Sequence, residues 1–156
     1  MTRANLLAWI LSASSAFADG HGHAFPRAPL ALAAGIVDAA LADASSAAPL
    51  FPDARTTAAL LLKIASRESG YRTEVVGDGG KSCGAFQTPC ASTPLRDPVR
   101  QPVLAIAILR RSFALCPEAP LAPYASGRCD SPRGRAISAD RLADVRRVLE
   151  LVEVTL

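Results

Sequence analysis

Residues 63–90 read KIASRESGYRTEVVGDGGKSCGAFQTPC, and three polar residues stand out in this stretch. Glu68 follows an apolar run, Asp78 lies within a glycine cluster, and Gln87 lies between two cysteines. The stretch places two acidic side chains ten residues apart, one after a helix-like pattern and one among turn-forming residues. This contrast suggests different roles for the two carboxyl groups.

The residues around these acids predict a helix followed by a small irregular lobe. Apolar residues recur at helical spacing over residues 53–69, and Gly70 is a common helix-ending residue. The glycine-rich residues 71–87 contain short alternating segments that favour a β-hairpin. We therefore expect Glu68 in the last helical turn, next to the lobe.

Apolar spacing also predicts helices over residues 29–46, 98–115 and 139–152, the last with Ser138 as its N-cap. Residues 98–115 are the most apolar of these, so we expect them to form the central core helix. Aromatic residues make up only 5% of the chain, and many of its hydrophobic residues are alanines. The predicted fold class is mainly α (α+β), a helical domain with a small irregular β-hairpin lobe.

Length and charge limit the possibilities further. A chain of 156 residues is long enough for one domain,. Its formal net charge is +3, and it contains no run of lysine or arginine. We therefore expect no nucleic-acid partner.

Residues 1–18 have the pattern of a secretory signal. One basic residue, Arg3, precedes an uncharged stretch that ends in a small-x-small motif at Ala16 and Ala18,. The alternative is a membrane anchor, but the uncharged run is shorter than the roughly 20 residues needed to span a bilayer. We expect a cleaved signal over residues 1–18, a linker over 19–28 and a folded domain over 29–156. The mature protein would then be periplasmic or extracellular, with no integral membrane segment.

Cleavage after Ala18 would create a new N-terminus, Asp19-Gly20-His21. A free amine, two amide nitrogens and an imidazole in third position can bind copper(II) or nickel(II). The alternative is a flexible tail with incidental histidines.

The four cysteines favour disulfides, because their number is even and the chain carries an export pattern,. Three pairings are possible, and we favour Cys83 with Cys90 and Cys116 with Cys129, since each pair brackets a turn-rich loop. A zinc site is the alternative, but the spacings are not those of paired zinc knuckles.

Three short motifs carry a resemblance to a known family. RESGY at residues 67–71, GDGGKSCGAFQ at 77–87 and PYASG at 123–127 resemble the goose-type lysozyme and soluble lytic transglycosylase (SLT) family of the lysozyme-like superfamily. In that family a catalytic glutamate and a serine end a helix, a glycine-x-x-glutamine element lines the cleft, and a tyrosine element closes it. The matching residues are Glu68 with Ser69, Gly84 with Gln87, and Tyr124 with Gly127.

The resemblance implies cleavage of the β-1,4 bond between N-acetylmuramic acid and N-acetylglucosamine in peptidoglycan. Glu68 would be the general acid and base, as a lytic transglycosylase or lysozyme-type muramidase requires. Such an acid must be partly sheltered from water, and the apolar run before Glu68 predicts that shelter. The residues expected to bind the glycan are Ser69, Ser82, Gly84, Phe86, Gln87, Tyr124 and Ser126.

The resemblance also implies that glycan strands are the partner and that no metal or organic cofactor is required. We expect the protein to be a monomer. Asp78 is similar in position to an aspartate that orients water in goose-type lysozymes, which would allow hydrolysis. If Asp78 does not orient a water molecule, the 6-hydroxyl of the muramic acid would attack its own C1 and form an anhydro product.

Several alternatives stay open at this point. Glu68 can be a solvated residue in a final helical turn, and Asp78 can be a turn residue that bonds nearby amides. Ala125 stands where the family has asparagine, and Ser126 is expected to supply the missing polar contact. A non-catalytic glycan-binding scaffold of the same fold is the competing function.

Overall fold

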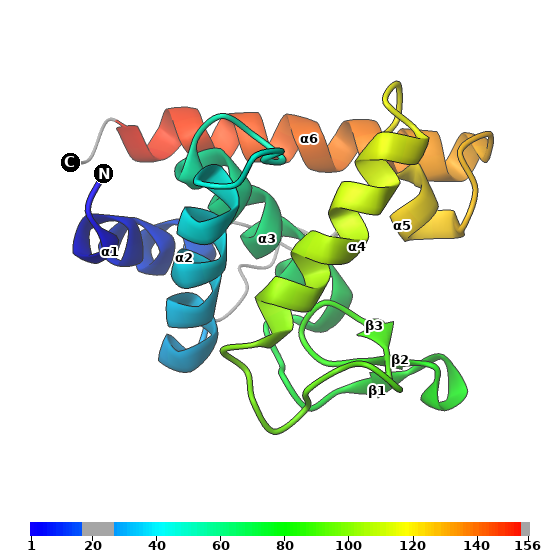
Figure 1. Cartoon of the computed structure of the whole chain (residues 1–156), viewed down its shortest axis with the longest axis horizontal. Coiled ribbons are helices and arrows are strands. Elements are labelled where there is room, and N and C mark those ends of the chain that lie inside the picture. Colours follow the sequence, from blue (N-terminus) through cyan, green and yellow to red (C-terminus); the bar gives the residue numbers. More distant parts are fainter. Residues whose placement is uncertain (17–26, 154–156) are drawn as a thin grey trace.

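The computed structural model describes residues 1–16 and 27–153 of the chain (Figure 1). The fold is mainly helical with one small antiparallel sheet, which confirms the predicted α+β class. In chain order its elements are α1 (Arg3–Ala13), the 3-10 helix η1 (Ser14–Ala16), α2 (Leu30–Ala44), α3 (Ala54–Ser69), β1 (Val76–Gly77), the 3-10 helix η2 (Asp78–Gly80), β2 (Ser82–Cys83), β3 (Thr88–Pro89), α4 (Gln101–Leu115), α5 (Ala122–Ser126) and α6 (Pro132–Glu153). The possible metal site at Asp19-Gly20-His21 lies outside the described residues.

Helix α3 passes through the interior of the molecule. Asp53 caps its N-terminus by accepting a hydrogen bond from the Thr56 amide at 2.8 Å. Gly70 ends it with φ of 60°, a left-handed conformation that glycine adopts without strain,. Every residue from Thr57 to Ser66 is buried. A helix buried on all sides is a core element rather than a surface one.

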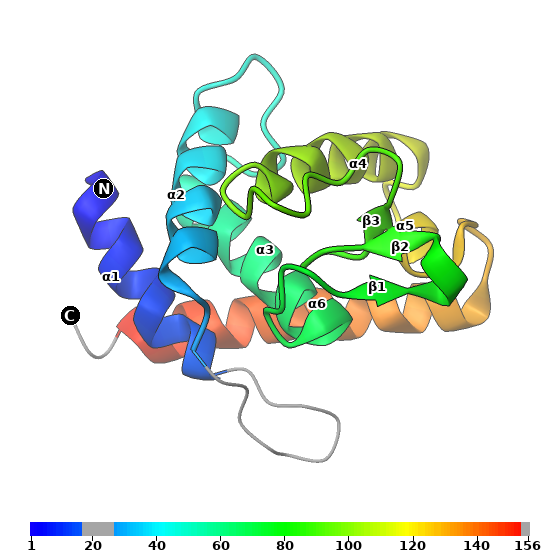
Figure 2. The same cartoon turned by 90° about the horizontal axis from the view of Figure 1, so that it is seen from below.

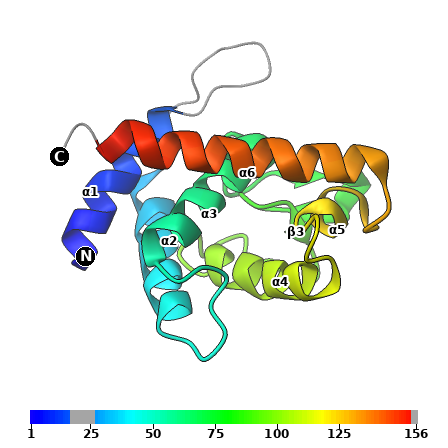
Figure 3. The ribbon, with the colours of Figure 1, turned by 90° about the horizontal axis from the view of Figure 1, so that it is seen from above.

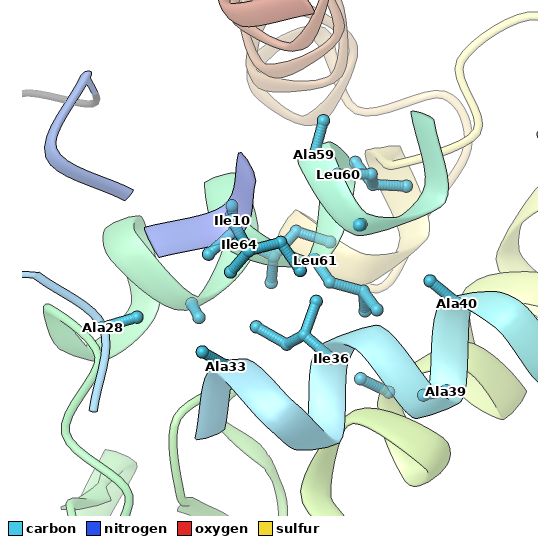
Figure 4. Packing of buried hydrophobic residues seen from close by; sticks show 14 of the residues in the cluster. Ile10, Ala28, Ala33, Ile36, Ala39, Ala40, Ala59, Leu60, Leu61 and Ile64 are labelled. Atoms are coloured by element: carbon cyan, nitrogen blue, oxygen red, sulfur yellow. The ribbon is translucent and has the colours of Figure 1, made fainter. Parts of the chain in front are cut away.

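The core forms where α1, α2 and α3 meet. Figure 4 shows Ile10 of α1, Ile36 of α2, and Leu61 and Ile64 of α3 pointing into this region, and all four are fully buried. Alanines of α2 and α3 occupy much of the remaining contact surface. The alanine-rich composition therefore produces close helix packing, as the sequence predicted.

Helix α6 covers a second side of α3. Figure 3 shows it running the length of the molecule, past α1, α3 and α5. It begins at Pro132, not at Ala139 as predicted. The Ser131 hydroxyl accepts from the Gly134 amide at 3.1 Å, as an N-cap does,. Ser138 instead lies buried within the helix and accepts a hydrogen bond from the Leu121 amide.

The prediction that residues 98–115 form the central helix is wrong. Helix α4 packs against α2 and α5, and its buried apolar residues are Ala105, Ile106 and Leu109. Val103, one of the apolar residues of this segment, is 59% exposed. The apolar character of this segment is spread around the helix, so hydrophobicity alone did not identify the buried face.

The segment predicted as a signal forms α1 and packs into the core. Among residues 1–16, the fully buried side chains are Leu6, Trp9, Ile10, Ala13 and Ser14. The Arg55 guanidinium lies 4.9 Å from the centroid of the Trp9 ring. The Tyr71 hydroxyl donates to the carbonyl of Ser14 at 2.9 Å. Cleavage after Ala18 stays a prediction, and it would separate these buried groups from the rest of the domain.

The small sheet forms the predicted lobe, which Figure 2 shows near the C-terminal end of α3. Its strand order is β1-β2-β3, and both pairings are antiparallel. A disulfide joins Cys83 to Cys90 across β2 and the end of β3, and a second joins Cys116 to Cys129. The favoured pairing is therefore confirmed, and the four sulfur atoms are not zinc ligands.

No helix within residues 1–16 and 27–153 is long and apolar enough to cross a membrane.

The burial of Trp9 can be tested by mutation. Trp9→Ala is expected to lower the free energy of unfolding by about 3–5 kcal/mol, because it removes a fully buried ring and leaves a cavity. Chemical denaturation followed by circular dichroism measures the change. Ser12→Ala, at an exposed position of the same helix, is the control. Equal stability of the two variants would contradict the packing of α1.

Candidate active site

Glu68 lies in the last turn of α3 and faces a basic side chain from α6. Its side chain is 22% exposed, and its Oε1 accepts a hydrogen bond from Nη2 of Arg141 at 2.6 Å. Arg141 itself is buried. The acid is partly sheltered, as expected, and the side chain in contact with it is a charged one. Sequence analysis did not identify Arg141, because its helical position within α6 gives no sign of the contact.

Tyr124 of α5 lies close enough to Glu68 to respond to its charge. Burial raises the pKa of the Tyr124 hydroxyl, and the negative charge of Glu68 raises it further, while Arg141 opposes the effect. The hydroxyl donates to the carbonyl oxygen of Phe86. Glu68, Tyr124 and Arg141 therefore meet where α3, α5, α6 and the lobe come together.

Ser69 does not have a hydroxyl free for substrate. Its side chain is buried, and its Oγ is 3.0 Å from the carbonyl oxygen of Ala85 and 3.2 Å from that of Ala65. The prediction that Ser69 binds glycan is therefore corrected. Its hydroxyl joins the end of α3 to the lobe and fixes the backbone next to Glu68.

Two residues of the glycine-x-x-glutamine element are also structural. Phe86 is 1% exposed, so its ring packs in the core, and the expectation that it binds the glycan is corrected. Gly84 is buried with φ of 76°, and a Cβ there would lie 2.6 Å from Oε1 of Gln101. Only glycine fits this position without strain. Gly84 therefore shapes the lobe rather than contacting substrate.

Gln87 is the member of this element that keeps a half-exposed side chain. Its Nε2 donates to the carbonyl of Gly84 at 2.9 Å, and its φ is 47°. The carbonyl of Phe86, its chain neighbour, accepts the Tyr124 hydroxyl. Gln87 is thus held next to the junction that includes Tyr124, and its role in binding stays a prediction.

Gln101, at the start of α4, is a residue that sequence analysis missed. It is 1% exposed, and its Oε1 accepts from the Ala85 amide at 2.8 Å. Its Nε2 donates to the carbonyls of Thr73 at 2.9 Å and Pro94 at 3.3 Å. One side chain thus satisfies the backbone of three loop segments. One sign of this role was present in the sequence: Gln101 lies in the first turn of the helix predicted over residues 98–115, next to the loop that precedes it.

Asp78 lies in the exposed turn between β1 and β2. Its Oδ2 accepts a hydrogen bond from the Ser82 hydroxyl at 2.6 Å, and its φ is 49°. Asp78 is therefore a turn residue, as the alternative interpretation held, but its observed partner is a serine hydroxyl and not a backbone amide,. The expected roles of Asp78 in orienting water and of Ser82 in binding glycan stay predictions.

Ser126 uses its hydroxyl inside the chain. Its Oγ lies 2.9 Å from the carbonyl oxygen of Ala122 and 3.2 Å from that of Arg128. A Cβ at Gly134 would lie 2.3 Å from this oxygen, so Ser126 faces α6. Ser126 is exposed, and its expected role in place of the family asparagine stays a prediction.

The remaining polar groups define the chemistry that the site can perform. A carboxyl group, a guanidinium and a neutral phenol lie together at the end of a rigid helix. A single carboxyl group of this kind can donate and then recover a proton. Comparisons with protein-family models, curated proteins and solved structures found no match.

The role of Gln101 in holding the lobe can be measured. Gln101→Leu leaves the Ala85 amide without its buried partner, so we expect the free energy of unfolding to fall by about 1–3 kcal/mol. Hydrogen exchange of the Ala85 amide should become faster. Gln101→Glu keeps the acceptor and loses the donor, so an intermediate effect is expected. Unchanged exchange in Gln101→Leu would contradict this role.

Alkaline titration tests the environment of both tyrosines, Tyr71 and Tyr124. Burial raises the pKa of each hydroxyl above the ordinary value of about 10,. The neutral phenols therefore favour the folded state below about pH 10, and this contribution is lost as the pH rises further. We expect tyrosinate absorbance to appear only together with unfolding. Ionisation of one tyrosine near pH 10, with circular dichroism unchanged, would contradict the prediction.

Proposed function

We propose that this domain cleaves the glycan strands of peptidoglycan between N-acetylmuramic acid and N-acetylglucosamine, with Glu68 as general acid and base. The observation that carries the proposal is the placement of Glu68. Its partly exposed carboxyl group lies at the end of a buried helix and interacts with Tyr124, whose hydroxyl in turn binds the carbonyl of Phe86. The motifs that resemble the SLT family thus lie around one junction in the fold.

The proposed reaction uses one carboxyl group. Glu68 donates its proton to the glycosidic oxygen as the bond from that oxygen to C1 of the muramic acid breaks. The 6-hydroxyl of the same sugar then attacks C1 and returns its proton to Glu68, which gives an anhydro product. In the hydrolytic alternative, water replaces the 6-hydroxyl. Because Asp78 is hydrogen-bonded to Ser82 in an exposed turn, we favour the intramolecular route.

The location proposed for this activity is the periplasm or the outside of the cell. Peptidoglycan lies there, and two disulfides are compatible with an oxidising compartment,.

A second candidate function is a non-catalytic glycan-binding scaffold. The burial of Phe86 favours it, because this removes one of the few aromatic rings available to stack on sugars,.

Product analysis separates the two functions. Purified protein is incubated with peptidoglycan, and the soluble muropeptides are identified by mass spectrometry. We expect anhydro ends from the wild type and at least about 100-fold less release from Glu68→Gln, because general acid catalysis contributes roughly 10²–10⁴-fold. Glu74→Gln, the same change at an exposed glutamate, should release as much as the wild type.

Other outcomes have defined meanings. Reducing ends in place of anhydro ends would indicate hydrolysis, and Asp78→Asn should then reduce release strongly. Equal release by the wild type and Glu68→Gln would contradict the catalytic role of Glu68. Binding to peptidoglycan without release would support the scaffold.

A further inference from the structure

Arg141 has an unusual environment for a residue at a helix–helix contact. It is 8% exposed and donates to Oε1 of Glu68 through Nη2. Its other terminal nitrogen, Nη1, is buried and has no hydrogen-bond partner in the part of the chain that the structure describes. A buried, unsatisfied N–H group is costly, so such a group in a folded protein calls for an explanation.

Helix contact alone does not explain this arrangement. The α3–α6 interface already contains the Lys63–Asp144 and Arg67–Asp140 ion pairs. An apolar side chain at position 141 would pack against α3 without the cost of burying a guanidinium. What Arg141 adds is a fixed positive charge on one oxygen of the proposed catalytic acid.

The two oxygens of Glu68 have different environments. Oε1 is held by Arg141 at 2.6 Å, whereas Oε2 has no hydrogen-bond partner among the residues that the structure describes. We propose that Arg141 is a positioning residue that pins Oε1, so that Oε2 exchanges the proton with the glycan. This inference rests on the proposed function and adds to it a residue outside the motifs.

The role of Arg141 follows the charge on Glu68 through the reaction. When Oε2 gives its proton to the leaving oxygen, the bonding electron pair of the C1–O bond goes to that oxygen and Glu68 becomes a carboxylate. The guanidinium then lies beside the new negative charge and holds it in place. When the 6-hydroxyl attacks C1, its proton returns to Oε2, and the cycle closes without any other reactant.

Steady-state kinetics on soluble, uncrosslinked glycan strands test this role. Arg141→Gln keeps polarity but removes the charge, and we expect kcat to fall about 10- to 100-fold with KM nearly unchanged, because misplacement of a catalytic group can cost about 10²-fold. Arg141→Lys keeps the charge without the planar fork, so an intermediate kcat is expected. Arg146→Gln, at an exposed position on the same helix, should behave as the wild type.

Chemical rescue distinguishes positioning from a structural role. Methylguanidinium at millimolar concentration should restore part of the kcat of Arg141→Gln, while methylammonium should restore less. A loss of kcat that neither cation restores would assign Arg141 a structural role and overturn the inference. If Arg141→Gln does not fold, the kcat of Arg141→Lys is compared with that of the wild type instead. Equal kcat values for these two proteins would overturn the positioning role of Arg141.

The failure of this inference can be told apart from failure of the proposed function. If the wild type is active and the kcat of Arg141→Gln is within about 3-fold of the wild-type kcat, only the role of Arg141 is overturned. A wild type that releases no muropeptide would overturn the proposed function and the role of Arg141 with it.

Discussion

The burial of α3 is the constraint on which the rest of the structure depends. Because this helix is surrounded by α1, α2 and α6, the residue that ends it has a fixed place in the molecule. Lys63, 1% exposed, pairs with Asp144 of α6, and burial lowers the pKa of its ammonium group against the opposing effect of that carboxylate. Along α3 the Arg67–Asp140 and Glu68–Arg141 pairs come after Lys63, whereas their α6 partners come before Asp144, so the two helices run in opposite directions. Breaking a buried pair such as Lys63–Asp144 costs about 3–5 kcal/mol,. The exposed Arg67–Asp140 pair contributes only about 0–1 kcal/mol,. The buried contacts therefore do most to fix α6 against the end of α3 where Glu68 lies.

The lobe is held by the same part of the fold. Three side chains from three helices bind the backbone of the Ala85–Phe86 dipeptide: the Ser69 hydroxyl, the Gln101 amide oxygen and the Tyr124 hydroxyl. With the Cys83–Cys90 disulfide, these bonds order a segment that has little regular structure of its own. The residues that the family resemblance assigned to substrate binding therefore act largely in building the junction. A catalytic group on rigid elements keeps its geometry better than one on a free loop.

The sequence predicted the helices and disulfides more reliably than it predicted which side chains are buried and which distant segments touch. Residues 53–69 were recognised as a helix because Asp53 and Gly70 are local signals, and the cysteine pairing followed from loops that bracket turns. The central helix was misassigned because the apolar residues of 98–115 lie all around α4. The start of α6 was misplaced because Ser131 and Ser138 are equally good caps by composition. Phe86 was expected to bind the glycan and Arg141 was not noticed, since burial and contact between distant segments are properties of tertiary packing.

The central claim is that Glu68, Tyr124 and Arg141 form one glycan-binding site at the meeting of α3, α5, α6 and the lobe. Its most direct test is a nuclear magnetic resonance titration of ¹⁵N-labelled protein with a soluble glycan fragment of peptidoglycan. The account predicts that the largest amide shifts cluster around residues 67–70, 85–88, 124–125 and 141. Shifts confined to the outer face of α4 around Val103 and Arg110, with none near Glu68, would contradict it.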